Sequence, residues 1–395
     1  MHVKVGVADG DFAGDTHIAI QLAVDAVVCY GGGTVELRPG AYLLNRSIRL
    51  GRNVRLVGAG PDTILRKGPG ARSALLADAD YGQMKVTAED PRGFLPGMEV
   101  VIGDDESYAY FASVATATLV QGNTIYLDKA FVADYAVTRN AEIWTGLSLL
   151  SGREVDSVII EGLTVDGGRS EDKPIDGCVG GGIYLYRARR CRLSDCIVLN
   201  FAGDGISYQT TQDVIVERCE VGHCASMGIH PGTGTERTIV RNCRLRHNGE
   251  DGLYLCYRVQ AGAFEGNEIY ENGQYGISIG HKDTDNTFTG NHVYRNRSHG
   301  VCFREETIAN AGSRNVFRRN TIEDNGECGV HIGGHTTDVL FEQNAIRDTR
   351  RGDDRTQRVG ICASEYASEI RTVNNTMDNM DTNLMGDISD EGPAR

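Results

Sequence analysis

Hydrophobic and polar positions recur with a fixed period through the second half of the chain. Each period opens with a glycine and an aliphatic residue, and strict alternation follows, as in Ile277-Ser278-Ile279. The glycines are 23, 23, 24, 24, 24, 29 and 31 residues apart. The pairs are Gly182-Ile183, Gly205-Ile206, Gly228-Ile229, Gly252-Leu253, Gly276-Ile277, Gly300-Val301, Gly329-Val330 and Gly360-Ile361. Because alternation indicates strands and no helical period intervenes, the repeat predicts a parallel β-helix with coils about 4.8 Å apart.

A second column of equivalent positions carries cysteine and then asparagine. Its members are Cys196, Cys219, Cys243, Asn267, Asn291, Asn320, Asn344 and Asn375. Short apolar strands such as Val214-Ile215-Val216 precede them, so one period holds at least two strands. We expect this column to point inward at a tight turn, where asparagine side chains bond along the stack. This favours a structural role for these cysteines over a metal or redox role.

The first third of the chain departs from the repeat. Residues 15–31 predict a capping helix with Asp15 as its N-cap and glycines at its end. Its apolar face is expected to hold Ile18, Leu22, Ala26 and Cys29. Residues 84–146 predict a small irregular β insertion, residues 150–380 the regular coils, and residues 381–395 a loose polar tail. We expect residues 1–395 to form one β-helix domain.

Composition narrows the function. Lys and Arg number 40 against 54 Asp and Glu, a net charge of −14, and no basic block occurs, which argues against a nucleic-acid partner. No apolar run is long enough for a membrane span, and the start at Met1 lacks a signal-like segment. The 11 cysteines show no CxxC pair. We expect free thiols in a cytoplasmic protein, or alternatively an exported protein whose signal was removed.

Alignment on the glycines turns the repeat into a surface map, because equivalent residues stack on neighbouring coils. Titratable residues gather on the coils of Gly252, Gly276 and Gly300. They are Tyr254, Tyr257, Arg258, His281, Lys282, Asp283, Arg304, Glu305 and Glu306, with His230, His331 and His335 extending the strip. The predicted patch is roughly 10 Å broad, which suits a few sugar units. The alternative is a solvated face of ion pairs, Arg258 with Asp283 and Lys282 with Glu306.

The chain resembles the pectin-lyase-like superfamily of right-handed parallel β-helices. The resemblance runs from the capping segment 15–31 and residues 32–40 to the coil that ends near Asn375. It implies an all-β, right-handed parallel β-helix with an N-terminal capping helix. Members of this superfamily are mostly polysaccharide lyases, glycoside hydrolases, esterases and uronate epimerases, and phage tailspikes and adhesins share the architecture. The resemblance therefore implies a polysaccharide or oligosaccharide partner without choosing the reaction.

Two reactions fit the residues of the patch. Eliminative cleavage of a uronate polymer needs a cation at the C5 carboxylate, a base near the C5 proton and a donor to the leaving O4. Suitable groups are Lys282, Arg304, Arg258, His281 and Tyr257. Hydrolysis needs two carboxylates about 5 Å apart for retention or about 6.5–9.5 Å apart for inversion. Candidates for such a pair are Asp251, Asp283, Glu305 and Glu306.

Two local motifs refine the resemblance. The stretch 282–291, followed by Phe303-Arg304, looks like the catalytic block of alginate lyases and chondroitinase-B-type lyases. That likeness implies Lys282 as the base and Arg304 as the donor or carboxylate partner. Calcium-binding members of that family place Glu residues shortly before the Lys, whereas Tyr275 and Ile277 stand here. We therefore expect no metal and no cofactor, and calcium is not supported.

The second motif resembles mannuronan C5-epimerases. It consists of residues 228–232 followed one coil later by residues 250–253. The epimerase signature Asp-Pro-His is replaced by His230-Pro231-Gly232, while Asp251 remains. This departure favours elimination over epimerisation.

The sequence thus predicts a carbohydrate-active enzyme that cleaves a uronate-containing glycan by β-elimination. The predicted catalytic residues are Lys282, Arg304, His281, Tyr257 and Asp251, and the predicted substrate contacts are Arg258, Tyr254, His230, Asp283, Glu305, Glu306, His331 and His335. A glycoside hydrolase, a C5-epimerase and a non-catalytic glycan-binding fibre are the alternatives, of which the fibre would form a trimer. The enzyme is expected to be a monomer or homo-oligomer with no nucleic-acid or membrane partner.

Overall fold

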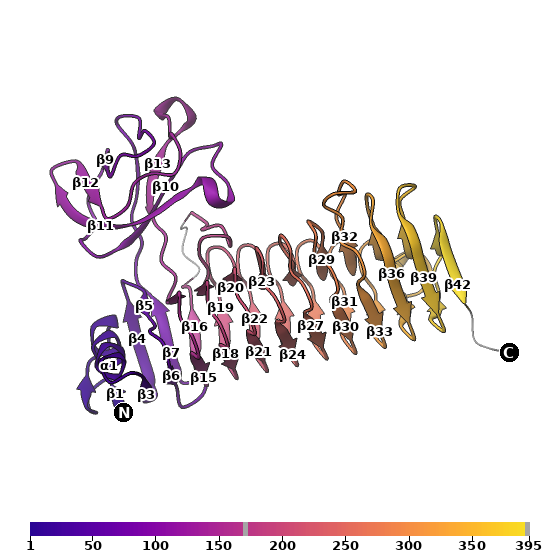
Figure 1. The fold of residues 1–395 in the computed structure, drawn as a ribbon, viewed down its shortest axis with the longest axis horizontal. Helices are drawn as coiled ribbons and strands as arrows, with labels where there is room; N and C mark the ends of the chain where they lie inside the picture. The colour runs from indigo at the N-terminus through magenta and orange to yellow at the C-terminus, as the bar shows by residue number, and fades with distance from the viewer. Residues whose placement is uncertain (169–172, 392–395) are drawn as a thin grey trace.

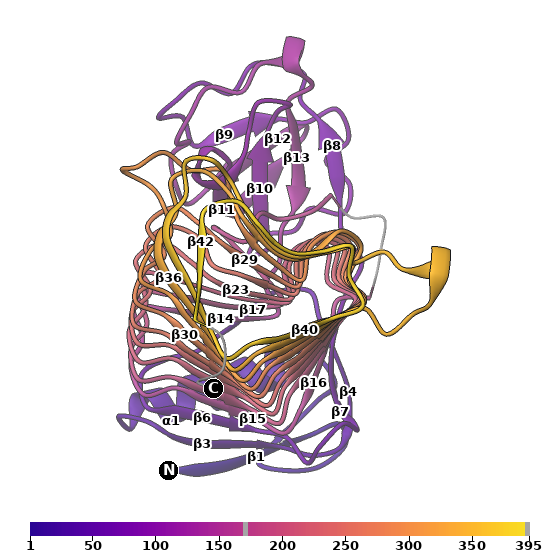
Figure 2. The ribbon, with the colours of Figure 1, turned by 90° about the vertical axis from the view of Figure 1, so that its right-hand side faces the viewer.

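The computed structural model describes residues 1–168 and 173–391, and it shows a β-helix whose coils stack along one axis (Figure 1). Three parallel sheets, named A, B and C here, run the length of the molecule. Each regular coil contributes one short strand to each sheet, so the prediction of a parallel β-helix is confirmed. Viewed along the axis, the coils superimpose on one another (Figure 2).

Sheets A, B and C differ in length and in their N-terminal members. Sheet A consists, in spatial order, of β2 (Phe12–Ala13), β1 (His2–Gly6), β3 (Gly33–Leu37), β6 (Val54–Val57), β15 (Ile159–Glu161), β18 (Arg192–Ser194), β21 (Ile215–Glu217), β24 (Ile239–Arg241), β27 (Ala263–Glu265), β30 (Thr287–Thr289), β33 (Val316–Arg318), β36 (Thr337–Glu342), β39 (Ser368–Val373) and β42 (Ile388–Glu391). Sheet B consists of β4 (Gly40–Leu44), β7 (Thr63–Lys67), β16 (Thr164–Asp166), β19 (Ile197–Leu199), β22 (Glu220–Gly222), β25 (Arg244–Arg246), β28 (Glu268–Tyr270), β31 (His292–Tyr294), β34 (Thr321–Glu323), β37 (Ala345–Arg347) and β40 (Thr376–Asp378). Sheet C consists of β5 (Ile48–Arg49), β14 (Leu150–Arg153), β17 (Ile183–Tyr186), β20 (Ile206–Gln209), β23 (Ile229–Pro231), β26 (Leu253–Tyr254), β29 (Ile277–Ile279), β32 (Val301–Phe303), β35 (Cys328–Ile332), β38 (Val359–Ala363) and β41 (Thr382–Met385).

The strands that follow the repeated glycines form sheet C. Their register follows the glycine alignment: Ser278 pairs with Tyr254 on one side and with Cys302 on the other. The glycines are required by close packing, because a Cβ at Gly276 would lie 2.6 Å from the carbonyl oxygen of Gly300. The repeated glycines therefore mark the positions where the backbones of neighbouring coils approach most closely.

Identical side chains stack through the core. Phe264, Phe288, Phe317 and Phe341 form one continuous column with ring centroids 4.4–5.0 Å apart. The predicted asparagine ladder lies inside the turn between sheets A and B, and each amide from Asn267 to Asn344 donates to the next side-chain oxygen at 2.9 Å. These bonds satisfy polar groups that have no access to water.

A second buried ladder was not predicted. The side-chain amides of Asn248, Asn272 and Asn296 each donate to the side-chain oxygen of the next asparagine at 2.9–3.1 Å, and the last of these acceptors is Asn325. The side-chain amide of Asn325 donates in turn to the side-chain oxygen of Gln357. Two such columns fix the register of the coils at two separate turns.

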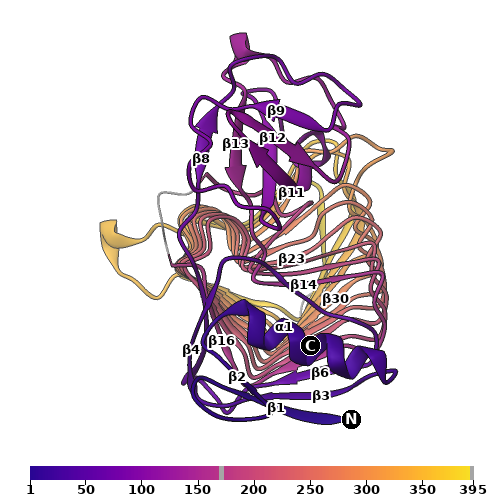
Figure 3. The ribbon, with the colours of Figure 1, turned by 90° about the vertical axis from the view of Figure 1, so that its left-hand side faces the viewer.

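The capping helix α1 (His17–Cys29) covers the N-terminal end of the core (Figure 3). Its N-cap is Thr16 and not Asp15, because Thr16 is extended and its hydroxyl accepts from the Ile18 amide. The Asp15 carbonyl is already used by the Leu43 amide, which ties that residue to β4.

The predicted apolar face of α1 is also wrong. The buried residues are Ala19, Ile20, Ala23, Val24 and Val27, whereas Ile18 is 58% and Leu22 52% exposed. The helix is apolar on more than one side, so periodicity alone does not select the face that packs on β1 and β3. Within the described residues, no helix is long and apolar enough to cross a membrane.

An antiparallel sheet with its own core interrupts the coils before β14. Its strands, in spatial order, are β8 (Arg72–Ala74), β13 (Glu142–Thr145), β10 (Glu99–Gly103), β11 (Ser113–Gln121), β12 (Thr124–Leu127) and β9 (Lys85–Thr87). The insertion therefore begins before residue 84, the boundary expected from the sequence. It stands beside the N-terminal coils (Figure 1). Two short helical turns, η1 (Ala109–Phe111) and η2 (Val137–Arg139), lie within it.

The C-terminal residues also differ from the expectation of a loose tail. Strands β41 and β42 add a further partial coil to sheets C and A. Leu384 stacks on Ile361, and Ile388 on Ile370, so both strands continue apolar columns of the core. A third helical turn, η3 (Gly352–Asp354), lies in the loop before β38.

Candidate functional site

The predicted patch lies on the outer face of sheet C and at the turn that follows it. Inward residues such as Ile277 and Ile279 are core, so Ser278 and its equivalents point outward as expected. Most of them are nevertheless covered: Tyr184 is 2%, Ser207 0% and His230 4% exposed. Sheet C therefore carries a partly enclosed site instead of an open strip.

Two segments provide this cover. From the insertion, the Tyr110 hydroxyl donates to Thr233 Oγ1 at 2.9 Å, and the Ala109 amide donates to Asp176 at 3.0 Å. The segment before β17 lies under this contact, and its Gly177 carbonyl accepts from the Ser207 hydroxyl at 2.6 Å. The insertion thus contacts the segment before β17, strand β20 and the turn after β23, the strand that carries His230.

Arg304 is the central cation of the site. It follows β32, and its guanidinium crosses two coils to reach Ser278 Oγ at 2.8 Å and the Leu255 carbonyl at 2.9 Å. Asp283 Oδ2 lies 3.4 Å away, and the Tyr254 ring centroid lies 4.6 Å from the guanidinium carbon. We call Tyr254, Ser278, Asp283 and Arg304 the Arg304 cluster. The arginine side chain is 20% exposed, so an anionic ligand can still reach it.

Gly280 makes room for this arrangement. It occupies the same repeat position as Cys256 and Arg304, on the coil between them. A Cβ on Gly280 would lie 2.8–3.0 Å from the Arg304 guanidinium. A side chain at this position would displace the arginine from the sheet, so the position of the Arg304 guanidinium depends on glycine at residue 280.

Asp251 is buried beside the Arg304 cluster and is 2% exposed. One oxygen accepts from the Tyr275 amide at 3.0 Å. Burial raises the pKa of Asp251 from 3.8 to about 7, against the opposing effects of that amide and of the Arg304 charge. A carboxyl group with such a pKa can change charge near neutral pH.

We predict a pH dependence of stability from this carboxyl group. An unfolded aspartate loses its proton near pH 3.9, whereas folded Asp251 keeps it up to about pH 7. The folded state therefore binds more protons in this window, and the free energy of unfolding falls as pH rises through it. Asp283, whose pKa burial also raises to about 7, acts in the same direction. Asp251→Asn should reduce this fall, measured as urea midpoints at about pH 5 and about pH 8.

The matched control is Asp353→Asn, an exposed carboxylate on η3, which should leave the pH dependence unchanged. An unaltered fall in the Asp251→Asn variant would contradict the assignment.

His230 is held in one orientation by a carboxylate from the preceding coil. Its Nδ1 lies 2.6 Å from Asp204 Oδ2, and both side chains are buried. The ring edge faces Tyr254, with centroids 5.0 Å apart. Burial lowers the pKa of His230, but Asp204 and Cys256 raise it more, to a net value of about 10. Asp204 also accepts from the Met227 amide.

Two cysteines complete this side of the site. Cys178, from the segment before β17, and Cys256, just after β26, lie next to His230, and all three possible ligand atoms are within 4.8 Å of one another. The neighbouring Cys178 thiol and then His230 lower the pKa of Cys256 to about 4. We call Cys178, Asp204, His230 and Cys256 the Cys256 cluster. It lies against the Arg304 cluster through Tyr254.

The remaining candidates of the central coils form a rim at the turn after sheet C. The rings of Tyr257 and His281 stack at 4.0 Å, and His281 Nδ1 lies 2.9 Å from Glu306. Arg258 lies over the Tyr257 ring at 5.6 Å. Lys282 has no side-chain hydrogen bond or ion pair among the residues that the structure describes. Its ammonium group is therefore available to a ligand.

The two ion pairs expected for a merely solvated face are not formed. Asp283 does not pair with Arg258; it is fully buried and accepts from the amides of Val259 and Gly280 at 2.9 Å. Glu306 pairs with His281 instead of Lys282. Because Asp283 holds its own turn, it supports Arg304 and does not line the surface.

The last three candidates lie toward the C-terminal coils. Glu305 accepts from the Gly334 amide at 2.7 Å and lies 3.5 Å from His331 Nε2. His335 lies beside Tyr366, with ring centroids 5.0 Å apart. These residues extend the rim without joining the Arg304 cluster.

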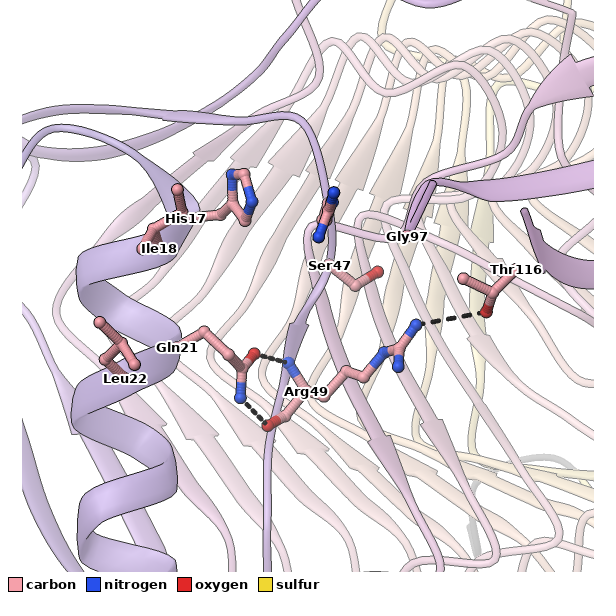
Figure 4. Close-up of a pocket in the computed structure, with 9 residues that line it drawn as sticks. His17, Ile18, Gln21, Leu22, Ser47, Arg49, Gly97 and Thr116 are labelled. Carbon is pink, nitrogen blue, oxygen red and sulfur yellow. Dashed lines mark hydrogen bonds between the residues drawn. The ribbon is translucent and has the colours of Figure 1, made fainter. Parts of the chain in front are cut away.

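A separate pocket of about 280 Å³ lies where α1 meets the insertion (Figure 4). Gln21 bonds to the backbone of Arg49, whose side chain donates to Thr116 at 3.3 Å. Burial and the Arg46 charge lower the pKa of His17 on its wall. None of the predicted site residues lines this pocket.

The sequence interpretation missed Asp204, Cys178 and Cys256 as members of the site. A signal existed for one of them: Asp204 and Asp251 both stand one residue before a repeat glycine. From that position a carboxylate reaches the second residue after the glycine of the next coil, as Asp204 reaches His230. No comparable signal exists for Cys178, which lies in the segment before β17, ahead of the first repeat glycine.

Comparisons with known proteins agree with this architecture. Residues 153–308 match the family model described as a right handed beta helix region. No curated protein matches the chain. Among solved structures, the A-modules of the mannuronan C-5 epimerases AlgE4 and AlgE6 of Azotobacter vinelandii are similar, each at 16% identity. The AlgE4 match covers 99% of this chain and 98% of the other with a TM-score of 0.65; the AlgE6 match covers 96% of each with 0.61.

A phage protein has the same fold. The tailspike gp49 of Pseudomonas phage LKA1 is 16% identical, and the match covers 94% of this chain and 71% of the tailspike with a TM-score of 0.50. At such identities the likeness establishes the fold, and the chemistry has to be argued from the site itself.

Proposed function

We propose that this chain, a right-handed parallel β-helix of the pectin-lyase-like superfamily, is an enzyme that cleaves a uronate-containing glycan by β-elimination. The observation that carries the proposal is the fixed, partly exposed guanidinium of Arg304 beside the Tyr254 ring. Two proteins of similar fold are named as mannuronan C-5 epimerases and another as a phage tailspike, which supports a polysaccharide substrate.

The first step of the proposed reaction is loss of the C5 proton of a uronate. A cation at the C5 carboxylate stabilises the negative charge that develops as this proton leaves. Arg304 is suited to this role because Ser278 and the Leu255 carbonyl, both uncharged, hold most of its hydrogen bonds. The carboxylate that contacts it, Asp283, lies at 3.4 Å and has a pKa raised to about 7 by burial, so it offsets the arginine charge only in part.

Lys282 is the proposed base. It stands on the rim, next in the chain to Asp283, which contacts Arg304. Its side-chain nitrogen is not bound to another side chain of the described residues, so a substrate can reach it, and in the neutral amine form it would accept the C5 proton.

Tyr254 is the proposed donor to the leaving O4. Burial raises the pKa of its phenol, which therefore keeps its proton at neutral pH. Its ring lies between Arg304 and His230, which fixes its place beside the bound uronate. Tyr257 and His281 on the rim present a stacked pair against which neighbouring sugar rings can pack.

Epimerisation at C5 is the second candidate, because two similar structures carry that name. Both reactions begin with removal of the C5 proton. They differ afterwards, since an epimerase returns a proton to the opposite face and leaves the chain intact. The same cluster could serve either outcome.

The test is incubation of the protein in D₂O with alginate, pectate, glycosaminoglycans and neutral glycans. We expect new reducing ends together with the ultraviolet absorbance of a C4=C5 double bond on one of the uronate polymers. Deuterium at C5 without cleavage would assign the epimerase reaction. New ends without absorbance would overturn elimination and indicate hydrolysis by carboxylates such as Glu305 and Glu306, and no change on any polymer would overturn the enzymatic proposal.

Lys282→Ala tests the assignment of the base within this assay. Elimination should fall about 100-fold, whereas the exposed Lys85→Ala control should retain full activity. Retained turnover in Lys282→Ala would remove that residue from the mechanism.

A further inference from the structure

We infer that Cys178, His230 and Cys256 form a binding site for a thiophilic divalent cation of the Zn²⁺ type. Among the described residues, these three offer two thiol sulfurs and one imidazole nitrogen within 4.8 Å of one another. Two thiolates and a histidine are a ligand set that zinc accepts readily. The site lies beside the proposed reaction centre, but the inference does not depend on the reaction.

The orientation of His230 is the strongest evidence. Its Nδ1 lies 2.6 Å from Asp204, which fixes the ring, and a ring nitrogen lies within 4.8 Å of both sulfurs. Nε2 has no hydrogen-bond partner among the described residues, and the side chain is buried, with only 5% of its surface exposed. Buried nitrogen atoms normally have a hydrogen-bond partner, so the absence of one at Nε2 indicates a ligand position. A carboxylate behind a histidine is also the usual support of a metal-binding imidazole.

The separations suit a metal ion. With Zn–S bonds of about 2.3 Å and Zn–N bonds of about 2.0–2.1 Å, tetrahedral ligand atoms lie roughly 3.5–3.8 Å apart. The three atoms here already fall inside 4.8 Å, so small side-chain rotations suffice. Two thiolates would balance the charge of the cation, while Asp204 remains bound to the imidazole.

Each ligand is held by its own element. Cys178 sits in a turn whose backbone bonds to the Asp176 carboxylate at 2.8 Å and to the Tyr184 hydroxyl at 2.8 Å. His230 lies on β23, and the Cys256 amide donates to the carbonyl of the adjacent Pro231 at 3.1 Å. Gly177 is needed for closure, because a Cβ there would lie 1.7 Å from Asp204 and 2.4 Å from His230.

The burial of the three ligands indicates on which side a fourth ligand would enter. Cys178 and His230 are buried, whereas Cys256 is partly exposed. An open position on the side of Cys256 would face Tyr254 and Arg304, since Tyr254 contacts both His230 and Arg304. A site with three protein ligands and one open position is typical of reactive zinc and not of purely structural zinc.

No zinc motif is visible in the sequence because the ligands come from three separate segments. They are 52 and 26 residues apart, and only the stacking of coils brings them together. The expectation of no metal, drawn from the missing Glu residues of the calcium-binding relatives and from the absence of a CxxC pair, is the point on which this inference departs from the sequence interpretation.

The test uses the full-length protein, reduced, stripped with a chelator and titrated with Co²⁺ and Zn²⁺. We expect one equivalent of either metal by mass spectrometry, and a thiolate-to-Co²⁺ charge-transfer band. Cys256→Ser and His230→Asn should each weaken binding about 100-fold or more, and Asp204→Asn about 10-fold. Cys302→Ser, a buried cysteine on β32 outside the cluster, is the matched control and should bind normally.

Binding below one tenth of an equivalent, or unchanged binding by Cys256→Ser, would overturn the site. Alkylation of wild-type protein provides a second measurement that does not depend on folding of the variants. Zn²⁺ should protect Cys178 and Cys256 from the reagent, read by peptide mass spectrometry, and equal labelling with and without Zn²⁺ would also overturn it. Failure of both tests would leave the elimination proposal intact, because metal content is measured without substrate.

Discussion

Arg304→Ala is expected to lower kcat/KM for the uronate polymer by about 10³-fold. The substitution removes the only guanidinium that contacts Tyr254, Ser278 and Asp283 in the described structure. Without it, the carboxylate charge that increases as the C5 proton leaves has no fixed partner. The measurement is initial rate against substrate concentration, with ultraviolet absorbance as the signal.

Two matched variants separate charge from fold. Arg304→Lys keeps the charge but cannot reach Ser278 and the Leu255 carbonyl together, so we expect an intermediate rate. Arg258→Ala removes an exposed rim cation and should change kcat/KM less than about 10-fold. Equal rates for wild type and Arg304→Ala would show that the cluster has no part in turnover.

Asn291→Ala is expected to lower the free energy of unfolding by about 3–5 kcal/mol. Its side-chain oxygen accepts from both the backbone amide and the side-chain amide of Asn267. Its side-chain amide donates to the Phe264 carbonyl and to the side-chain oxygen of Asn320. Alanine leaves several of these groups buried without partners. Urea unfolding followed by circular dichroism measures the loss.

The control for this prediction is Gln274→Ala, an exposed amide side chain on the turn after β28. It should change the free energy of unfolding by less than about 0.5 kcal/mol. A loss of under about 1 kcal/mol in Asn291→Ala would mean that the ladder is a consequence of stacking and not a source of stability.

The features that repeat from coil to coil could be predicted from the sequence. Gly276 is required because neighbouring backbones approach closely, and Asn291 is required because its turn is buried and needs hydrogen-bond partners. The same local requirements recur from coil to coil. Periodicity therefore revealed the fold, the asparagine column and the register of sheet C. The alignment also placed Tyr254 and Arg304 on coils only two apart, and their side chains are in contact across the coil between them.

Features that occur once could not be predicted in this way. Tyr110 closes over Thr233 from 123 residues away, and nothing in the local pattern indicates that contact. Thr16 and not Asp15 is the N-cap of α1, and the Asp15 carbonyl instead accepts a hydrogen bond from the Leu43 amide of β4, a contact with a distant segment. β41 lacks the repeat glycine, so its stacking on β38 was hidden, although Leu384 meets Ile361 there.

The most direct test of the central claim compares a uronate polymer with the same polymer after reduction of its carboxyl groups. If Arg304 acts on the C5 carboxylate, the protein should produce the C4=C5 absorbance from the intact polymer, and the carboxyl-reduced polymer should give neither absorbance nor new reducing ends. Cleavage of both polymers at similar rates would contradict the account.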